Sequence, residues 1–184
     1  MDRLEIDNIL KINELNNELE FERATNIYGK LRWMLEEDNS LKPIRKHLKN
    51  LIKHFENKHW ENEEHIDEKQ ITESDIAEKI VNNENKFIQK RKQLIKERLK
   101  EAGIIQKDLA QILGHRANYM SELINGVRPF SRDDIVVIHR LFGINFKYLI
   151  PQSLKSEVTT HIRLTLGKLK NKKVKLNIED LEMA

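Results

Sequence analysis

The sequence predicts an all-α protein, with a helical hairpin in its N-terminal region followed by a domain of shorter helices. Two observations predict this fold class. Between residues 15 and 55, apolar side chains recur every three or four positions, which is the period of an amphipathic helix. Between residues 94 and 150, shorter apolar runs of the same period end at glycine, as helices commonly do. We expect three parts, at residues 1–75, 76–151 and 152–184.

The N-terminal hairpin is predicted from two apolar stripes and the turn between them. Asn39 and Ser40 interrupt the first stripe and can cap a second helix. Neither helix can bury its stripe without the other helix or a partner. The first stripe comprises Leu15, Leu19, Ile27, Leu31 and Leu35, and the second comprises Leu41, Ile44, Leu48, Leu51 and Phe55.

A polar stretch from Lys58 to Glu73 lacks this periodicity, so we expect a linker there and a domain boundary close to it. From Ser74 a helical pattern resumes and continues to a stop at Gly103. This pattern is compatible with one long helix or with two, in which case the break would fall at the pair Asn82-Asn83.

Two short helices separated by a glycine turn follow. The first is predicted from Gln106 to Leu113 and ends at Gly114; the second runs from Ala117 to Ile124 and ends at Asn125-Gly126. In a helix-turn-helix of this form the first helix crosses the phosphate backbone of DNA, and the second lies in the major groove. A capped helix from Ser131 to Gly143 and a short helix from Phe146 to Ile150 complete the predicted domain.

The charge distribution agrees with DNA binding by this domain. Residues 1–85 carry 13 Lys and Arg against 20 Asp and Glu, whereas residues 86–132 carry 11 against 4. A basic segment that coincides with a helix-turn-helix provides the cations that phosphate neutralisation requires. The acidic segment before it repels DNA and suits a basic partner, although charge runs of either sign are often only solvated helix faces.

Asn118 is the strongest candidate for reading a base, because a side-chain amide can form a bidentate pair with adenine. A surface or capping role for this asparagine is the alternative. Other candidates for base readout on the same helix are Arg116, Ala117, Tyr119, Ser121 and Glu122. Candidates for phosphate contact are Gln106, Lys107, Asn125, Arg128 and Arg132, although Asn125 also suits an ordinary turn.

The C-terminal extension gives a mixed pattern. We expect a helix to about Leu169 and then a short β-strand at Val174, Leu176 and Ile178. Five lysines lie in the segment from Gly167 to Asp180. They allow dimerisation, nonspecific phosphate contact or disorder.

Several functional classes are disfavoured. The chain has no cysteine, which excludes disulfides and thiolate metal sites. His47, His54, His59 and His65 lack the acidic residue of an HExxH metal motif, and no phosphate-binding glycine loop is present. We therefore expect neither an enzyme nor a cofactor nor a metal. With no membrane-spanning run and an acidic N-terminus unlike a secretory signal, we expect a cytoplasmic protein.

The segment from Leu94 to Ile150 resembles the Xre (lambda-repressor-like) helix-turn-helix family. Residues at that family's usual places are Gln106, Leu109-Ala110, Gly114, Asn125-Gly126, Arg128-Pro129 and Gly143. The resemblance implies a five-helix domain that binds palindromic operators as a homodimer. It also implies that Gln106 and Asn125 contact phosphate, while Ala117, Asn118 and Glu122 face the bases. Ile105 departs from the family, which commonly has Ser or Thr there as a helix cap.

The N-terminal sequence INELNNELEFERATNIYGKLRWML, followed by LKNLIKHFENKHW, resembles the region that precedes the helix-turn-helix in HigA-type antitoxins. That resemblance implies a toxin-antitoxin system in which this region binds a small basic toxin of RelE-like ribonuclease fold, and in which the complex acts as a repressor of its own operon. Toxin-binding candidates are Leu19, Phe21, Ile27, Leu31 and Leu35. The alternative is a stand-alone Xre-family transcription regulator whose N-terminal helices serve dimerisation or effector binding.

Overall fold

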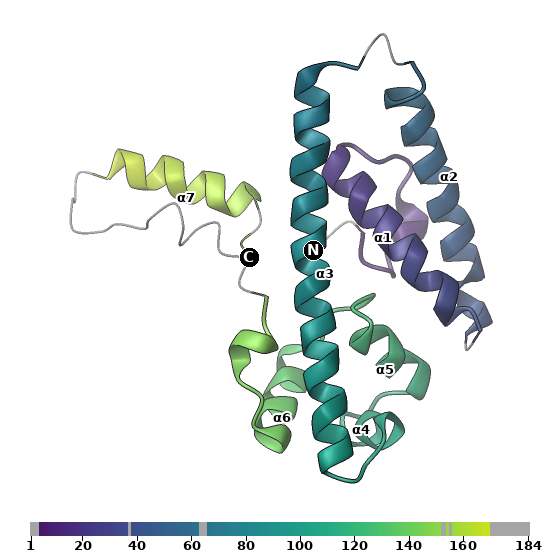
Figure 1. The fold of residues 1–184 in the computed structure, drawn as a ribbon, viewed down its shortest axis with the longest axis vertical. Coiled ribbons are helices and arrows are strands. Elements are labelled where there is room, and N and C mark those ends of the chain that lie inside the picture. Colours follow the sequence, from purple (N-terminus) through teal and green to yellow (C-terminus); the bar gives the residue numbers. More distant parts are fainter. Residues whose placement is uncertain (1–3, 37, 63–65, 152–153, 155, 170–184) are drawn as a thin grey trace.

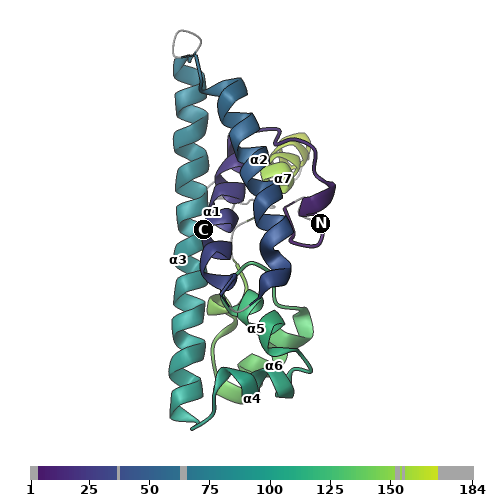
Figure 2. The same ribbon diagram turned by 90° about the vertical axis from the view of Figure 1, so that its right-hand side faces the viewer.

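The computed structural model describes residues 4–36, 38–62, 66–151, 154 and 156–169. Throughout this part of the chain the regular elements are helices, so the predicted all-α class is confirmed. Figures 1 and 2 show that one long helix, α3, runs along most of the molecule, with the N-terminal helices beside one half of it and the shorter helices around the other half. The α-helices are α1 (Glu18–Met34), α2 (Lys42–His59), α3 (Glu68–Glu101), α4 (Gln106–Ile112), α5 (Ala117–Ile124), α6 (Arg132–Phe142) and α7 (Ser156–Lys168).

Helices α1 and α2 form the expected hairpin and bury their apolar stripes between themselves and the segment before α1, and α1 also packs along α3. That segment contains the 3-10 helix η1 (Ile9–Lys11). Asn17 caps α1 by accepting a hydrogen bond from the backbone N–H of Glu20. The cap before α2 is Asp38, rather than Asn39 or Ser40, and it opens the 3-10 helix η2 (Asn39–Leu41) that leads into α2.

Four of the five apolar residues predicted to bind a toxin pack in the core of this hairpin. Leu31 is fully buried, and Phe21, Ile27 and Leu35 are half-buried against the same core. Leu19 is also half-buried. The rings of Phe21 and Phe55 stack with their centroids 4.9 Å apart. These side chains therefore hold α1 to its neighbours.

Helix α3 is continuous through Asn82-Asn83, which resolves the choice between one helix and two. It begins at Glu68, because the Asp67 side chain accepts a hydrogen bond from the N–H of Gln70. The predicted linker from Lys58 to Glu73 is therefore too long: α2 continues to His59, and α3 starts before Ser74. The proposed division at residue 75 falls inside α3, which packs against both halves of the protein.

The second domain is built from the C-terminal part of α3 with α4, α5 and α6. Its core includes Ile95, Leu109, Met120, Leu123 and Ile138, all fully buried or nearly so. Ser131 caps α6 and Gly143 ends it in the left-handed region, as predicted. The expected helix from Phe146 to Ile150 is instead a 3-10 turn, η4 (Phe146–Tyr148).

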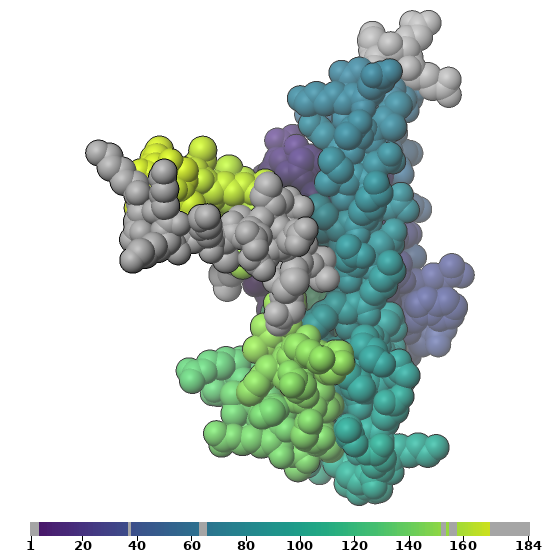
Figure 3. Space-filling view, turned by 60° about the vertical axis from the view of Figure 1, so that its left-hand side comes forward, coloured from purple at the N-terminus to yellow at the C-terminus, as the bar shows by residue number. Residues whose placement is uncertain are grey.

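The C-terminal extension forms α7, which agrees with the helix predicted up to about Leu169. Figures 1 and 3 show α7 to one side of α3. Val158 and Leu164 are exposed on it, and Leu169 is exposed just after it. The strand predicted at residues 174–178 lies outside the described residues. None of the helices that the structure describes is long and apolar enough to cross a membrane.

Candidate nucleic-acid interface

Side-chain contacts hold the start of α4 and the turn between α4 and α5. At the start of α4, Ile105 provides no capping side chain, but the carboxylate of Asp108 accepts a hydrogen bond from the Ile105 N–H at 2.8 Å. Within the turn, His115 Nε2 lies 2.9 Å from an oxygen of Asp134, whose side chain is buried and also caps α6. The His115–Asp134 contact ties this turn to the start of α6.

The first turn of α5 presents side chains to the outside. Arg116, Ala117 and Asn118 are exposed, and Tyr119 is 36% exposed. Ser121, on the next turn, is half-buried. An exposed N-terminal turn on the second helix is the part of a helix-turn-helix that enters the major groove.

Three of the predicted phosphate-contact residues lie at the starts of helices. Gln106 is half-buried at the first position of α4, with Lys107 exposed beside it. Arg132 is exposed at the first position of α6. Backbone N–H groups at a helix start favour anions, and a nearby cation strengthens that preference.

Two of the sequence candidates face inward instead. Glu122 is only 6% exposed, and its carboxylate accepts a hydrogen bond from the Arg128 guanidinium in an ion pair. Asn125 is half-buried; its amide donates to the Ser121 carbonyl at 2.9 Å, and its oxygen accepts from Lys92 Nζ at 2.7 Å. Both side chains therefore make contacts within the protein that stabilise the end of α5.

The N-terminal region reaches this surface at two polar contacts and one apolar contact. Asn118 donates its side-chain amide to a carboxylate oxygen of Asp38 at 3.2 Å. Arg128 forms an ion pair with Asp7 in addition to the one with Glu122. Val127, in the loop after α5, is buried in the core of the N-terminal hairpin. No local sequence signal indicated that Asp7 and Asp38 would lie here.

Helix α3 supports the C-terminal end of α5 with cations. Arg91 is only 5% exposed and lies 4.9 Å from the ring of Phe130, with one guanidinium nitrogen 3.5 Å from the Leu123 carbonyl. Burial lowers the pKa of Arg91 to about 10. Positive charge is favourable at a helix C-terminus because the last carbonyls carry partial negative charge. Arg91 and Lys92 of α3 therefore stabilise the C-terminal end of α5, a role that the sequence analysis did not identify.

Lys30 on α1 adds a further cation near Arg91 and Lys92, and desolvation by burial lowers its pKa from 10.5 to about 8. The folded state disfavours the charged form, so Lys30→Met should raise the free energy of unfolding at pH 7 by about 1–3 kcal/mol. Above the unfolded-state pKa of 10.5 the lysine is neutral in both states, and the difference should disappear. Urea unfolding of both proteins between pH 7 and pH 11 measures this. A difference independent of pH would show that charge burial is not its cause.

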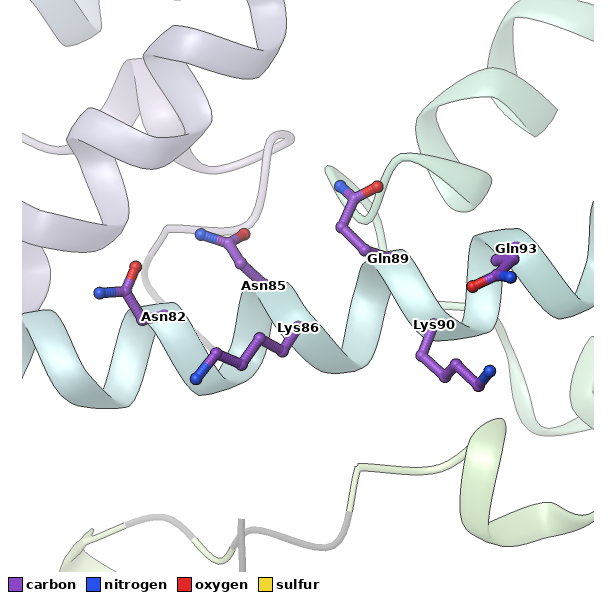
Figure 4. A pocket seen from close by; sticks show the side chains of 6 residues that line it. All are labelled: Asn82, Asn85, Lys86, Gln89, Lys90 and Gln93. Carbon is purple, nitrogen blue, oxygen red and sulfur yellow. The ribbon is translucent and has the colours of Figure 1, made fainter.

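A groove of about 680 Å³ lies along α3 and is lined by polar residues (Figure 4). Every residue lining it comes from this one helix, so it holds no convergent set of catalytic groups. Within the described part of the chain, no group of three or more His, Asp or Glu side chains could hold a metal ion. The lining residues are Asn82, Asn85, Lys86, Gln89, Lys90 and Gln93.

Comparison with known families identifies one part of the chain. Residues 95–149, from the last turns of α3 to the end of η4, match the family model described as helix-turn-helix. This segment is therefore a DNA-binding helix-turn-helix domain of the kind found in transcription regulators. The match covers less than a third of the 184 residues. No curated protein and no solved structure matches the chain.

Proposed function

We propose that this protein is an antitoxin that represses its own operon. Its helix-turn-helix domain binds a palindromic operator as a homodimer, and its N-terminal region binds and neutralises a small basic toxin. The family match to residues 95–149 carries the DNA-binding half of this proposal. The acidic balance of residues 1–85 supports the toxin-binding half.

The exposed first turn of α5 supports a narrower set of base-reading residues than the sequence did. Arg116, Ala117, Asn118 and Tyr119 remain candidates, and Ser121 is a candidate at the edge of this set. We omit Glu122 because it is buried against Arg128. The residues proposed to contact DNA phosphates are Gln106, Lys107, Arg128 and Arg132.

We expect Asn118→Ala to lose sequence discrimination, because a bidentate amide–adenine pair contributes about 1–3 kcal/mol of preference for the correct base. The measurement is fluorescence anisotropy with a duplex selected from a random library by the wild-type protein, and with a shuffled duplex. Lys107→Ala is the control: it should weaken binding to both duplexes and lower the salt slope by about 1. Equal losses on both duplexes for Asn118→Ala would remove it from the readout set.

We propose a toxin-binding surface different from the predicted one, on the N-terminal half of α3. Ile71, Ile76 and Ile80 are exposed on the N-terminal half of α3. Glu73, Asp75 and Glu78 are exposed on the same turns. The outer face of α2, by contrast, carries four exposed lysines and would repel a basic partner. These are Lys42, Lys46, Lys49 and Lys53.

Co-expression with the product of a neighbouring short reading frame tests this half of the proposal. The wild-type protein should form a stable complex with a basic partner and restore growth of cells that express it. Ile76→Ser/Ile80→Ser should lose both effects, because exposed apolar residues within an acidic surface would form the centre of such an interface. Lys46→Ser/Lys53→Ser on α2 is the matched control and should retain both. If both variants neutralise the toxin equally well, Ile76 and Ile80 are not part of the toxin-binding surface.

A stand-alone regulator is the second candidate function. This function is favoured because α1 buries its apolar stripe within the protein. Most of the residues predicted to bind a toxin therefore pack against other parts of the same chain. A protein that binds its operator normally but purifies from its host without a second polypeptide would support this alternative.

A further inference from the structure

Two of the residues that should contact DNA, Arg128 and Asn118, already contact acidic side chains of the N-terminal region. Asp7 precedes η1 and Asp38 precedes α2, so they come from two separate segments of the N-terminal region. Asp7 binds Arg128, and Asp38 accepts the amide of Asn118. A carboxylate on an arginine imitates a phosphate, and a carboxylate on an asparagine amide takes the donor that an adenine would receive.

We infer that Asp7 and Asp38 are internal competitors of DNA, which hold the helix-turn-helix domain in a state of reduced affinity until DNA displaces them. The inference rests on the proposed DNA-binding function. Each carboxylate occupies a side chain that DNA needs, so the two contacts and the DNA complex exclude each other. The observed affinity is then the intrinsic affinity multiplied by the fraction of molecules in which the contacts are open.

The surroundings of the two contacts favour the closed state without making it permanent. Val127 is buried in the N-terminal core immediately before Arg128, so the N-terminal region stays beside this surface. Asp7 itself is 72% exposed, and an exposed ion pair opens readily. The ion pair with Arg128 lowers the pKa of Asp7, so this carboxyl stays ionised at neutral pH.

The test is the double variant Asp7→Asn/Asp38→Asn in the full chain. Asp38 uses one oxygen to cap Ser40 and the other to accept from Asn118. Asparagine keeps an acceptor for the cap but would place an amide donor opposite Asn118. Glu36→Gln/Glu56→Gln is the control, because it removes two exposed negative charges from the same region without altering these contacts.

Anisotropy with the selected duplex should show that the Asp7→Asn/Asp38→Asn variant binds about three- to tenfold more tightly than the control. Equal affinity of the two variants would overturn the inference while leaving the DNA-binding function intact. Absence of DNA binding by the wild type and both variants would overturn the inference and the proposed function together.

Hydrogen exchange of the wild-type protein gives an independent measurement of the displacement. Adding the selected duplex should speed exchange in residues 4–12 and 38–42, because both segments lose contacts with the DNA-binding domain. Slower exchange in these segments on adding DNA would show that they contact DNA directly, and would overturn the inference.

Discussion

Gly126→Ala should lower the free energy of unfolding by about 2–4 kcal/mol. Gly126 follows the last residues of α5 with a φ of +69°, in the left-handed region that side chains disfavour. A Cβ added there would lie 2.6 Å from the Cδ1 atom of Ile88 on α3 and 2.7 Å from its Cγ2 atom. Both the backbone and the packing against α3 therefore oppose the substitution.

Gly126 also positions the residues that follow it. The N–H of Gly126 donates to the Leu123 carbonyl and the N–H of Val127 donates to the Glu122 carbonyl, which together form a Schellman ending for α5. If the loop shifts to accommodate a methyl group, Val127 and Arg128 move with it. We therefore expect Gly126→Ala to weaken DNA binding as well as stability.

Urea unfolding of Gly103→Ala provides the matched control. Gly103 has a similar φ of +67°, but an added Cβ would meet no atom within 4 Å. Gly103→Ala should lower the free energy of unfolding by about 1 kcal/mol, from the backbone conformation alone. If the two variants lose the same free energy of unfolding, the Ile88 side chain moves away from the added methyl group without destabilising the protein.

Local signals predicted the helix-turn-helix domain well. The ends of α4 and α5, the Ser131 cap and the Gly143 ending all depend on residues within a few positions of each other. The same reasoning misplaces the start of α3, because a polar stretch without an apolar stripe predicts a linker. The first turns of α3 are mostly exposed, and a helical segment that buries little needs no apolar stripe.

Contacts between distant segments were not predictable in this way. Periodicity shows which residues are apolar, but it does not show whether they meet the same chain or a partner. The resemblance to antitoxins implies that Leu31 and Phe21 bind a toxin, whereas in the structure both pack in the hairpin core. The sequence predicts that Glu122 reads a base, whereas in the structure it is buried. Its burial depends on an ion pair with Arg128, six positions later, which the spacing of residues on α5 does not reveal. The approach of Asp7 to Arg128 spans 121 positions, and no local pattern encodes it.

Arg128→Ala should destabilise the protein by about 3 kcal/mol, in addition to any effect on DNA. The side chain of Glu122 is only 7% exposed, and Arg128 is its ion-pair partner. Removing the arginine leaves a buried carboxylate without a counter-ion, which costs more than the surface contact with Asp7 contributes. Urea unfolding of the variant measures the loss.

The double variant Arg128→Ala/Glu122→Gln separates the structural role of Arg128 from its role in DNA binding. A neutral amide needs no counter-ion, so most of the lost stability should return, and unfolding data for both single variants complete the cycle. DNA binding should remain weak with a reduced salt slope, because the cation that meets phosphate is still missing. If the double variant regains wild-type affinity for both the selected and the shuffled duplex, Arg128 acts only through Glu122. If Glu122→Gln restores no stability, the buried ion pair is not the reason that Arg128 is needed.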